Sequence, residues 1–409
     1  MSERSLDYLI IGGGPAGTNA AEAIRRRDRV GSIAIVTNES HPLYIRPSLA
    51  FYMRGLIQRD QLFQKKIDFY TKNSIELIRA KKVIRVSVAD KKAFLEGEDI
   101  FLYKKLLIAT GGRPRRWQIP GAGLEGVYYL RTLNDAEAMM NRMRSSKKAI
   151  VVGGGFLGMD LNQTFRIAGL DVVNIIREKV FWSHFLDEDG GRLVERILRE
   201  NGVDLIPEDE VVEVLGSTTV TGIRTSRGKQ LYADIVGVGI GIGLNLDLLD
   251  KKEVEINRGI IVDDHLRSSS PDLFAAGDIA EFYDPVMDKR HIMGNWSNAM
   301  AQGKVAGANM AGEDKALNVV SSYQIDIWGR SLIAMGDTAA SDDTRVFIRD
   351  QRDQYKYGRI FVRNSIIKGA ILIDLKELEG PLSTLIKEKR EVKNPEVLSD
   401  SGFDLKGLL

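Results

Sequence analysis

Two glycine-rich loops are the residues of this chain whose spacing points most directly to chemistry. Residues 8–17 read YLIIGGGPAG, and residues 149–158 read AIVVGGGFLG. Each segment is an apolar run followed by G-x-G-x-x-G spacing, which in a βαβ unit turns the N–H groups and positive dipole end of a helix toward phosphates. Two copies predict that one chain binds two dinucleotides, with glycine turns that hold no ligand as the alternative.

The glycines of each loop have separate predicted roles. The first permits a tight turn, the second lets the backbone approach a pyrophosphate, and the third lets the helix pack on its strand. The predicted phosphate-binding residues are Gly12, Gly14, Pro15, Ala16 and Gly17 in the first loop, and Gly153, Gly155, Phe156, Leu157 and Gly158 in the second.

The residue at the end of the following strand distinguishes the two loops. The apolar run 33–37 ends in Asn38 and Glu39, and a carboxylate there can accept both hydroxyls of an adenosine ribose, which suits FAD. The run 172–176 is instead followed by Arg177, whose guanidinium can pair with a ribose 2′-phosphate and favours NADPH. Glu178 comes next, so NADH stays open as the alternative.

Composition excludes several classes of protein. The 409 residues contain no cysteine, which rules out disulfides, thiol nucleophiles and cysteine-ligated iron–sulfur clusters. The net charge of +2 does not favour binding of nucleic acid. The sequence also has no run of 18 apolar residues, the length that a membrane-spanning helix requires. His41, His184, His265 and His291 show no metal-ligand spacing, so no metal is predicted. The glycine loop follows the N-terminus without a signal-peptide pattern, which predicts a soluble, cytoplasmic protein.

Six further segments carry a family resemblance. They are Tyr44–Leu49, Val83, Ala109–Pro114, Gly239–Gly241, Ser270–Asp278 and Asn295–Gly303. In this order, over about residues 6 to 375, they resemble the two-dinucleotide flavoprotein reductases of the pyridine nucleotide-disulfide oxidoreductase superfamily, which share the fold of glutathione reductase. Within it the chain looks most similar to the ferredoxin, putidaredoxin and rubredoxin reductases, the nitrite reductase flavin modules and apoptosis-inducing factor.

The resemblance implies roles for individual residues. Trp296 is expected beside the isoalloxazine, with a core tryptophan as the alternative, and Asp278 is expected to bind the ribityl chain. The other implied FAD contacts are Arg46, Pro47, Val83, Ala109, Thr110, Gly111 and Gly277. The implied NAD(P)H contacts outside the second glycine loop are Gly239, Ile240 and Gly241.

The positions of these motifs predict an α/β fold with two Rossmann-like dinucleotide-binding domains and a C-terminal α+β domain. The expected bounds are 1–114 and 246–316 for the FAD domain, 115–245 for the NAD(P)H domain and 317–409 for the last domain. In the last domain we expect strands at 345–348, 359–362 and 370–373, a turn at 364–365 and a helix at 382–389. The tail from Asn394 is polar and is a candidate for disorder.

Two positions depart from the reductase pattern. Family members often place a lysine near flavin N5 and pair it with a glutamate that follows the second glycine loop, whereas this chain has Phe51 and Asp160 there. Losing both members together avoids leaving one buried charge unpaired. It would also make flavin reduction less favourable, while Phe51 as plain packing is the alternative.

Three functions follow from these observations. The first is an FAD-dependent reductase that takes hydride from NAD(P)H and passes electrons to a ferredoxin- or rubredoxin-type partner. The second is an NAD(P)H oxidase or diaphorase-like subunit of a larger flavoenzyme complex. The third is a partner-recruiting flavoprotein similar to apoptosis-inducing factor, favoured by weak flavin reduction. By resemblance, the last domain caps the flavin and often forms a homodimer or partner face. Because no cysteine is present, disulfide reduction is excluded.

Overall fold

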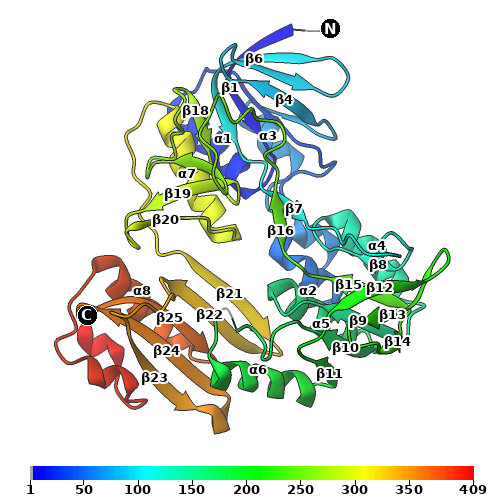
Figure 1. Cartoon of the computed structure of the whole chain (residues 1–409). Helices are drawn as coiled ribbons and strands as arrows, with labels where there is room; N and C mark the ends of the chain where they lie inside the picture. Colours follow the sequence, from blue (N-terminus) through cyan, green and yellow to red (C-terminus); the bar gives the residue numbers. More distant parts are fainter. Residues whose placement is uncertain (1–2, 184) are drawn as a thin grey trace. The chain divides into compact units, whose positions relative to one another are not determined.

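The computed structural model describes residues 3–183 and 185–409, so His184 lies outside the described residues. The described chain forms two compact units (Figure 1). Of the described residues, the first unit consists of 3–47, 59–113 and 243–321, and the second of 48–58, 114–183, 185–242 and 322–409. Residues 48–58, which the sequence places within the first FAD segment, therefore pack with the second unit.

The first unit is built on a seven-stranded sheet in the order β3-β2-β1-β6-β5-β4, with β18 paired to β6. Its strands 1, 2, 3, 6 and 18 are parallel, and β4 and β5 join them as antiparallel strands. The elements of this unit are β1 (Glu3–Ile11), α1 (Pro15–Arg27), β2 (Ile33–Val36), α3 (Ile67–Lys72), β3 (Ile75–Ile78), β4 (Val83–Ser87), β5 (Lys92–Leu95), β6 (Ile100–Ile108), β17 (Ile260–Val262), β18 (Leu273–Ala275), β19 (Ala280–Asp284), β20 (Lys289–His291) and α7 (Trp296–Met310).

The parallel strands form because their apolar runs can be buried on both faces. Leu9 and Ile10 in β1, and Leu106 and Leu107 in β6, are fully buried. A strand covered on both faces by helices or a second layer is expected to read as such a continuous apolar run. The short strands β7 (Gly112–Pro114) and β16 (Ile242–Leu244) pair where the chain leaves and re-enters this unit.

The second unit contains a five-stranded sheet in the order β11-β10-β9-β15-β8 and a three-stranded antiparallel sheet β12-β13-β14. Its elements up to residue 242 are α2 (Leu49–Met53), β8 (Val127–Tyr128), α4 (Leu133–Met143), β9 (Lys148–Val152), α5 (Phe156–Ile167), β10 (Asp171–Ile175), α6 (Glu188–Glu200), β11 (Val203–Ile206), β12 (Val211–Gly216), β13 (Val220–Thr225), β14 (Gln230–Tyr232) and β15 (Ile235–Val238). This β-α-β order repeats the arrangement of the first unit around the second glycine loop.

The C-terminal part of the second unit is an antiparallel sheet in the order β21-β22-β25-β24-β23 with α8 beside it (Figure 1). The elements are β21 (Ser322–Ile327), β22 (Arg330–Gly336), β23 (Arg345–Gln351), β24 (Lys356–Arg363), β25 (Ile366–Ile373) and α8 (Glu379–Glu388). The expected strands and helix are present, and the predicted turn lies at Asn364 and Ser365, both with positive φ. Tyr357 ties this sheet to α6, because its hydroxyl donates to the Asp187 carboxylate at 2.7 Å.

The tail after Asn394 is ordered, which corrects the expectation of disorder. Short 3₁₀ turns at Pro395–Ser399 and Leu405–Leu408 bury Leu398 and Leu405 completely. The guanidinium of Arg349, itself buried, donates from Nε to the carbonyl of Leu398 at 2.9 Å and from Nη2 to that of Phe403 at 3.0 Å. Two buried leucines and one buried arginine therefore hold a tail in which seven of the 16 residues are polar or charged.

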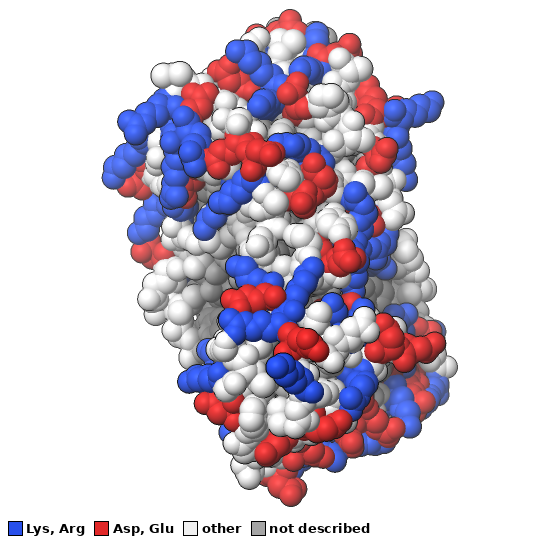
Figure 2. Space-filling view, turned by 90° about the vertical axis from the view of Figure 1, so that its left-hand side faces the viewer, with Lys and Arg blue, Asp and Glu red and all other residues white. Residues whose placement is uncertain are grey.

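Charges are mixed on the surface. Lysine and arginine side chains lie interspersed with aspartate and glutamate over the face drawn in Figure 2, in keeping with the net charge of +2. Among the described residues, no helix combines the length and the apolar character that crossing a membrane requires.

We predict that Arg349→Met destabilises the C-terminal tail. The variant loses two hydrogen bonds from a charged donor, which should lower the free energy of unfolding by about 2–3 kcal/mol and expose the tail to protease. Limited proteolysis and chemical denaturation measure both effects. The control is Arg345→Ala, which removes an exposed ion pair to Glu396 on the same tail and an exposed contact with the Phe347 ring and should cost less than about 1 kcal/mol. Equal protease resistance of wild type and Arg349→Met would contradict the prediction.

Candidate functional site

The predicted flavin residues of the first unit lie at the carboxyl ends of adjacent parallel strands. Ile11, the last residue of β1, is paired with Val36 of β2 and with Ile108 of β6. Ile108 is paired in turn with Ala275 of β18. The sheet edge therefore brings together Gly12–Gly17, Asn38–Glu39, Ala109–Gly111 and Gly277–Asp278. Ligands of open α/β sheets bind at this edge.

The first glycine loop has the local geometry that its three predicted roles require. Gly12 has φ +121°, and a Cβ there would lie 2.2 Å from the carbonyl oxygen of Ala109. A Cβ on Gly17 would lie 1.9 Å from the Gly12 oxygen, so helix and strand touch through backbone. A Cβ on Gly14 meets no atom within 4 Å. The space beside the N-terminus of α1 is thus open on the side where a phosphate would approach.

Glu39 is already held in place by two neighbours. The hydroxyl of Tyr44 donates to Oε2 at 2.5 Å, and Nη2 of Arg46 donates to Oε1 at 2.6 Å. Burial lowers the pKa of Arg46, but the charge and hydrogen bond of Glu39 and the charge of Asp278 raise it more, and the net pKa lies above its ordinary value. Because each carboxylate oxygen has a second lone pair, Glu39 can still accept ribose hydroxyls.

The backbone before Val83 runs beside the same edge. The N–H of Ala80 donates to the carbonyl of Glu39 at 3.1 Å, and the N–H of Lys81 donates to that of Thr37 at 3.0 Å. Val83 itself opens β4 and is buried. Its predicted contact with FAD thus lies on a segment fixed to the Glu39 strand end.

The N-terminal half of α7 adds buried amide groups to this site. The side-chain oxygen of Gln302 accepts a hydrogen bond from the Gly277 N–H at 2.8 Å, while its Nε2 has no partner among the described residues. Nδ2 of Asn295, the residue before Trp296, is likewise buried and unpartnered within the described chain. Sequence motifs alone did not single out these two donors.

These unpartnered donors provide a test of whether the residues fit FAD. A buried donor without a partner costs about 1–3 kcal/mol, so a native protein is expected to satisfy it with a ligand or water. FAD offers carbonyl, hydroxyl and phosphate oxygens to an edge that already has an open helix N-terminus. The residues present therefore fit FAD.

The second unit repeats the arrangement around its own glycine loop. Val152 of β9 is paired with Ile175 of β10 and with Val238 of β15. This register brings together Gly153–Gly158, Ile176–Glu178 and Gly239–Gly241. The predicted nicotinamide-nucleotide residues therefore share one sheet edge.

Its glycines repeat the pattern of contacts seen in the first loop. Gly153 has φ +104°, and a Cβ there would lie 2.3 Å from the carbonyl oxygen of Gly239. A Cβ on Gly158 would lie 2.1 Å from the Gly153 oxygen, whereas one on Gly155 meets nothing within 4 Å. The N-terminus of α5 is therefore open in the same way as that of α1.

Arg177 is available for a ligand. Its side chain is exposed and makes no hydrogen bond or ion pair with any described residue, whereas Ile176 before it is buried. Lys179 is engaged by Glu188, with 3.5 Å between Nζ and Oε2. Ser183 is exposed and adds no charge.

Asp160 has a cationic partner, which corrects the expectation that the charge pair is lost. Nη2 of Arg54 donates to Oδ1 of Asp160 at 2.9 Å. Arg54 lies three residues after Phe51, at the end of α2, and so reaches the same side of that short helix. Phe51 is 38% exposed, and its ring centroid lies 5.6 Å from the Arg54 guanidinium carbon.

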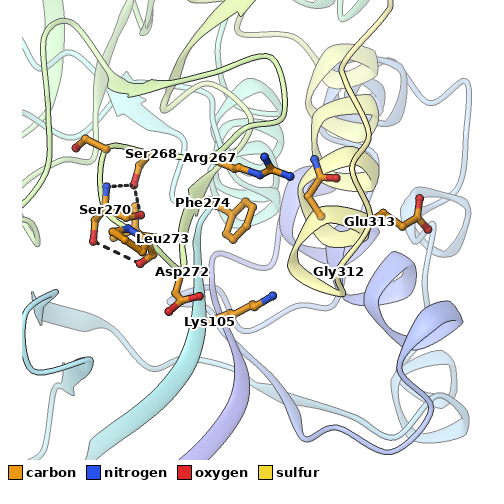
Figure 3. A pocket seen from close by; sticks show the side chains of 12 residues that line it. Lys105, Arg267, Ser268, Ser270, Asp272, Leu273, Phe274, Gly312 and Glu313 are labelled. Atoms are coloured by element: carbon orange, nitrogen blue, oxygen red, sulfur yellow. Dashed lines mark hydrogen bonds between the residues drawn. The ribbon is translucent and has the colours of Figure 1, made fainter.

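A separate pocket of about 460 Å³ opens before the start of β18, in the sequence Arg267–Leu273 (Figure 3). Two cations border it, and both are engaged: Nζ of Lys105 donates to the Met310 carbonyl at 2.7 Å, and Arg267 pairs with Asp314 at 2.8 Å. None of the predicted site residues lines this pocket. Gly277 and Asp278, the predicted residues nearest in sequence, follow the opposite end of β18.

Comparison with known proteins gives consistent matches. Residues 6–303 match the family described as pyridine nucleotide-disulphide oxidoreductase, and residues 322–390 match the rubredoxin NAD+ reductase C-terminal domain. The chain is 30% identical over 354 residues to NADH-rubredoxin oxidoreductase of Clostridium acetobutylicum, covering 86% of this chain and 87% of the relative. The structure of a ferredoxin reductase for the CYP199A2 system of Rhodopseudomonas palustris superimposes with a TM-score of 0.91 at 26% identity, covering 98% of this chain and 99% of that one.

Some relatives are much longer than this chain. The assimilatory nitrate reductase electron transfer subunit of Bacillus subtilis is 27% identical over 405 residues, which cover 95% of this chain but 51% of the relative. A nitrite reductase of the same organism is matched over 48% of its length. The chain therefore spans about half the length of these curated relatives.

We predict that two substitutions in the first glycine loop have separable effects. Gly14→Ala places its methyl group in open space, so the fold should keep its stability while FAD binds on the order of tenfold more weakly. Gly17→Ala forces Cβ against the Gly12 carbonyl and should lower the free energy of unfolding by about 1–3 kcal/mol. FAD titration of apoprotein and thermal melts distinguish the two. Unchanged FAD affinity in Gly14→Ala would contradict the prediction that this loop binds the FAD diphosphate.

Proposed function

Because this chain belongs to the pyridine nucleotide-disulphide oxidoreductase family, we propose that it is an FAD-dependent NAD(P)H reductase that passes electrons to a separate ferredoxin- or rubredoxin-type protein. One observation carries the proposal: two glycine loops with open helix N-termini each share a sheet edge with the strand end that is predicted to bind a ribose. A cytoplasmic location remains a prediction from the sequence.

The chain's own residues supply binding and orientation in this proposal. The N-termini of α1 and α5 hold the two diphosphates with backbone N–H groups. Glu39, fixed by Tyr44 and Arg46, orients the adenosine ribose of FAD, and Asp278 accepts from the ribityl hydroxyls. Bound FAD supplies the step from two-electron hydride acceptance to single-electron release.

The acceptor is proposed to be a separate protein because this chain offers no redox group of its own. Its 409 residues contain no cysteine, so a thiol relay of the disulfide-reductase kind cannot follow the flavin. The C. acetobutylicum relative is by name a rubredoxin oxidoreductase. A small iron–sulfur or rubredoxin partner has the single-electron chemistry that such a flavoprotein requires.

One alternative has its own support. A relative of about twice this length is by name the electron transfer subunit of a nitrate reductase, which favours an NAD(P)H-oxidising subunit of a larger complex as the second candidate. The partner-recruiting function keeps only its sequence support, the absence of the family's lysine–glutamate pair, and gains no further support here, since Asp160 is paired with Arg54 instead.

Anaerobic rapid mixing tests the proposed reductase. Purified protein should be yellow, release FAD on denaturation, and lose its oxidised flavin absorbance within the dead time or milliseconds after NADPH or NADH is added. Added rubredoxin or ferredoxin should then be reduced in one-electron steps. Protein that holds FAD but is not bleached by either nucleotide would exclude both the reductase and the subunit alternative. Fast bleaching without reduction of any small acceptor would favour the subunit.

We further propose a moderate preference for NADPH, which rests on Arg177. An exposed guanidinium without a protein partner can hold a 2′-phosphate through charge-assisted hydrogen bonds, whereas a carboxylate there would repel it. Because Arg177 is exposed and Ser183 adds no second cation, we expect kcat/KM to be only about tenfold higher with NADPH than with NADH.

We predict that Arg177→Ala removes this preference and nearly keeps activity with NADH. Measuring kcat/KM for both nucleotides on wild type and variant decides the matter. Lys179→Ala is the matched control, since its ammonium already pairs with Glu188. A wild type that prefers NADH would mean that Glu178 holds the ribose.

A further inference from the structure

Arg54 is an unusual cation in this unit because it is almost completely enclosed. Its side chain is 2% exposed, and all its hydrogen bonds within the second unit go to one turn of α5. Nη2 donates to Oδ1 of Asp160 at 2.9 Å and to the Asp160 carbonyl at 3.2 Å, and Nε donates to Oγ1 of Thr164 at 3.3 Å. The hydroxyl of Thr164 donates to the same Asp160 carbonyl at 2.6 Å. The Arg54 side chain is thus held by hydrogen bonds to Asp160 and Thr164 of this turn.

Asp160 occupies a sensitive position on that helix. It lies five residues after Gly155, which at 1.5 Å per residue is about 7.5 Å along the axis from the N-terminus of α5. Charges at this separation are still inside the screening length of about 8–10 Å at physiological ionic strength, and partly buried ones are screened less. A carboxylate here competes for the positive end of α5 with any diphosphate bound there.

The surroundings of Asp160 make its charge costly. Burial raises the pKa of Asp160 from 3.8 to about 6, Arg54 lowers it through its charge and hydrogen bond, and Asp326 of β21 raises it again. Arg54 therefore supplies positive charge against this carboxyl, and Asp326 adds negative charge. Above pH 6 Asp160 is ionised and depends on Arg54.

We propose that Arg54 cancels the charge of Asp160 beneath the second glycine loop, and so keeps the N-terminus of α5 favourable to the diphosphate of the nicotinamide nucleotide. This inference rests on the proposed function, because it assumes that α5 binds that nucleotide. Arg54 acts through Asp160 and needs no contact with the ligand. Removing the cation should weaken binding, and removing the carboxylate as well should restore it.

Calorimetric binding of oxidised nucleotide to the FAD-loaded enzyme tests the proposal without turnover. The probe is NADP+ or NAD+, whichever wild type binds more tightly. At pH 8, Arg54→Gln should raise Kd about tenfold, and Arg54→Lys, which keeps the charge, should stay within about threefold of wild type. The double variant Arg54→Gln/Asp160→Asn should also return to within about threefold of wild type. FAD content and melting temperature verify that each protein is folded.

The pH dependence separates charge from packing. Without Arg54 the pKa of Asp160 rises further, so the defect of Arg54→Gln should shrink at pH 6, where the carboxyl is protonated. Asp160→Asn alone should bind as tightly as wild type or more tightly at pH 8, which keeps the test valid if Arg54→Gln does not fold.

Three results would overturn the inference. They are an Arg54→Gln Kd within twofold of wild type at pH 8, a double variant as weak as Arg54→Gln, or an Asp160→Asn variant that binds about tenfold more weakly. A folded, FAD-loaded wild type that binds neither nucleotide would instead overturn the proposed function, and this inference with it.

Discussion

Close backbone contact at the two glycine loops is the constraint on which both candidate sites depend. In each loop a helix, its own strand and the neighbouring strand meet at carbonyl oxygens that leave no room for a side chain: at Gly12 and Gly17 in one case, at Gly153 and Gly158 in the other. This contact fixes the helix N-terminus at the sheet edge, where the flanking strands also end. The middle glycine of each loop faces open space for the same reason. A ligand phosphate can therefore approach the backbone only because protein atoms are excluded there.

Much of this arrangement could be predicted from the sequence because the interactions are local. A G-x-G-x-x-G loop, the strand before it and the acidic or basic residue after the next strand lie within about 30 residues, and a βαβ unit fixes their relation. The antiparallel strands near the C-terminus were equally predictable, since their apolar alternation surrounds a short polar turn at Asn364. In both cases the pattern of side chains and the backbone geometry agree.

The interactions that could not be predicted are those made by single side chains over long sequence distances. Arg54 binds Asp160 from more than a hundred residues away, and nothing in the spacing near Phe51 marks it as the partner. Arg349 orders a tail that was expected to be disordered, because two buried leucines and hydrogen bonds to two carbonyls are enough to fix it. The amides of Asn295 and Gln302 lie in a motif that was recognised, but only their burial identifies them as unpartnered donors.

The pairing of β18 with β6 has a consequence for how this protein is made. The sheet β11-β10-β9-β15-β8 of the second unit is formed by strands within residues 127–238, so all of its strands emerge from the ribosome as one continuous segment. The predicted flavin site lies at the sheet edge where β1 and β18 end, so it needs both Ile11 and Ala275. At about 5–20 residues per second, the synthesis of these two residues is separated by tens of seconds. The nascent N-terminal strands must therefore wait, with an incomplete sheet, while a whole second sheet emerges and folds. The cofactor site that begins first along the messenger is the one completed last.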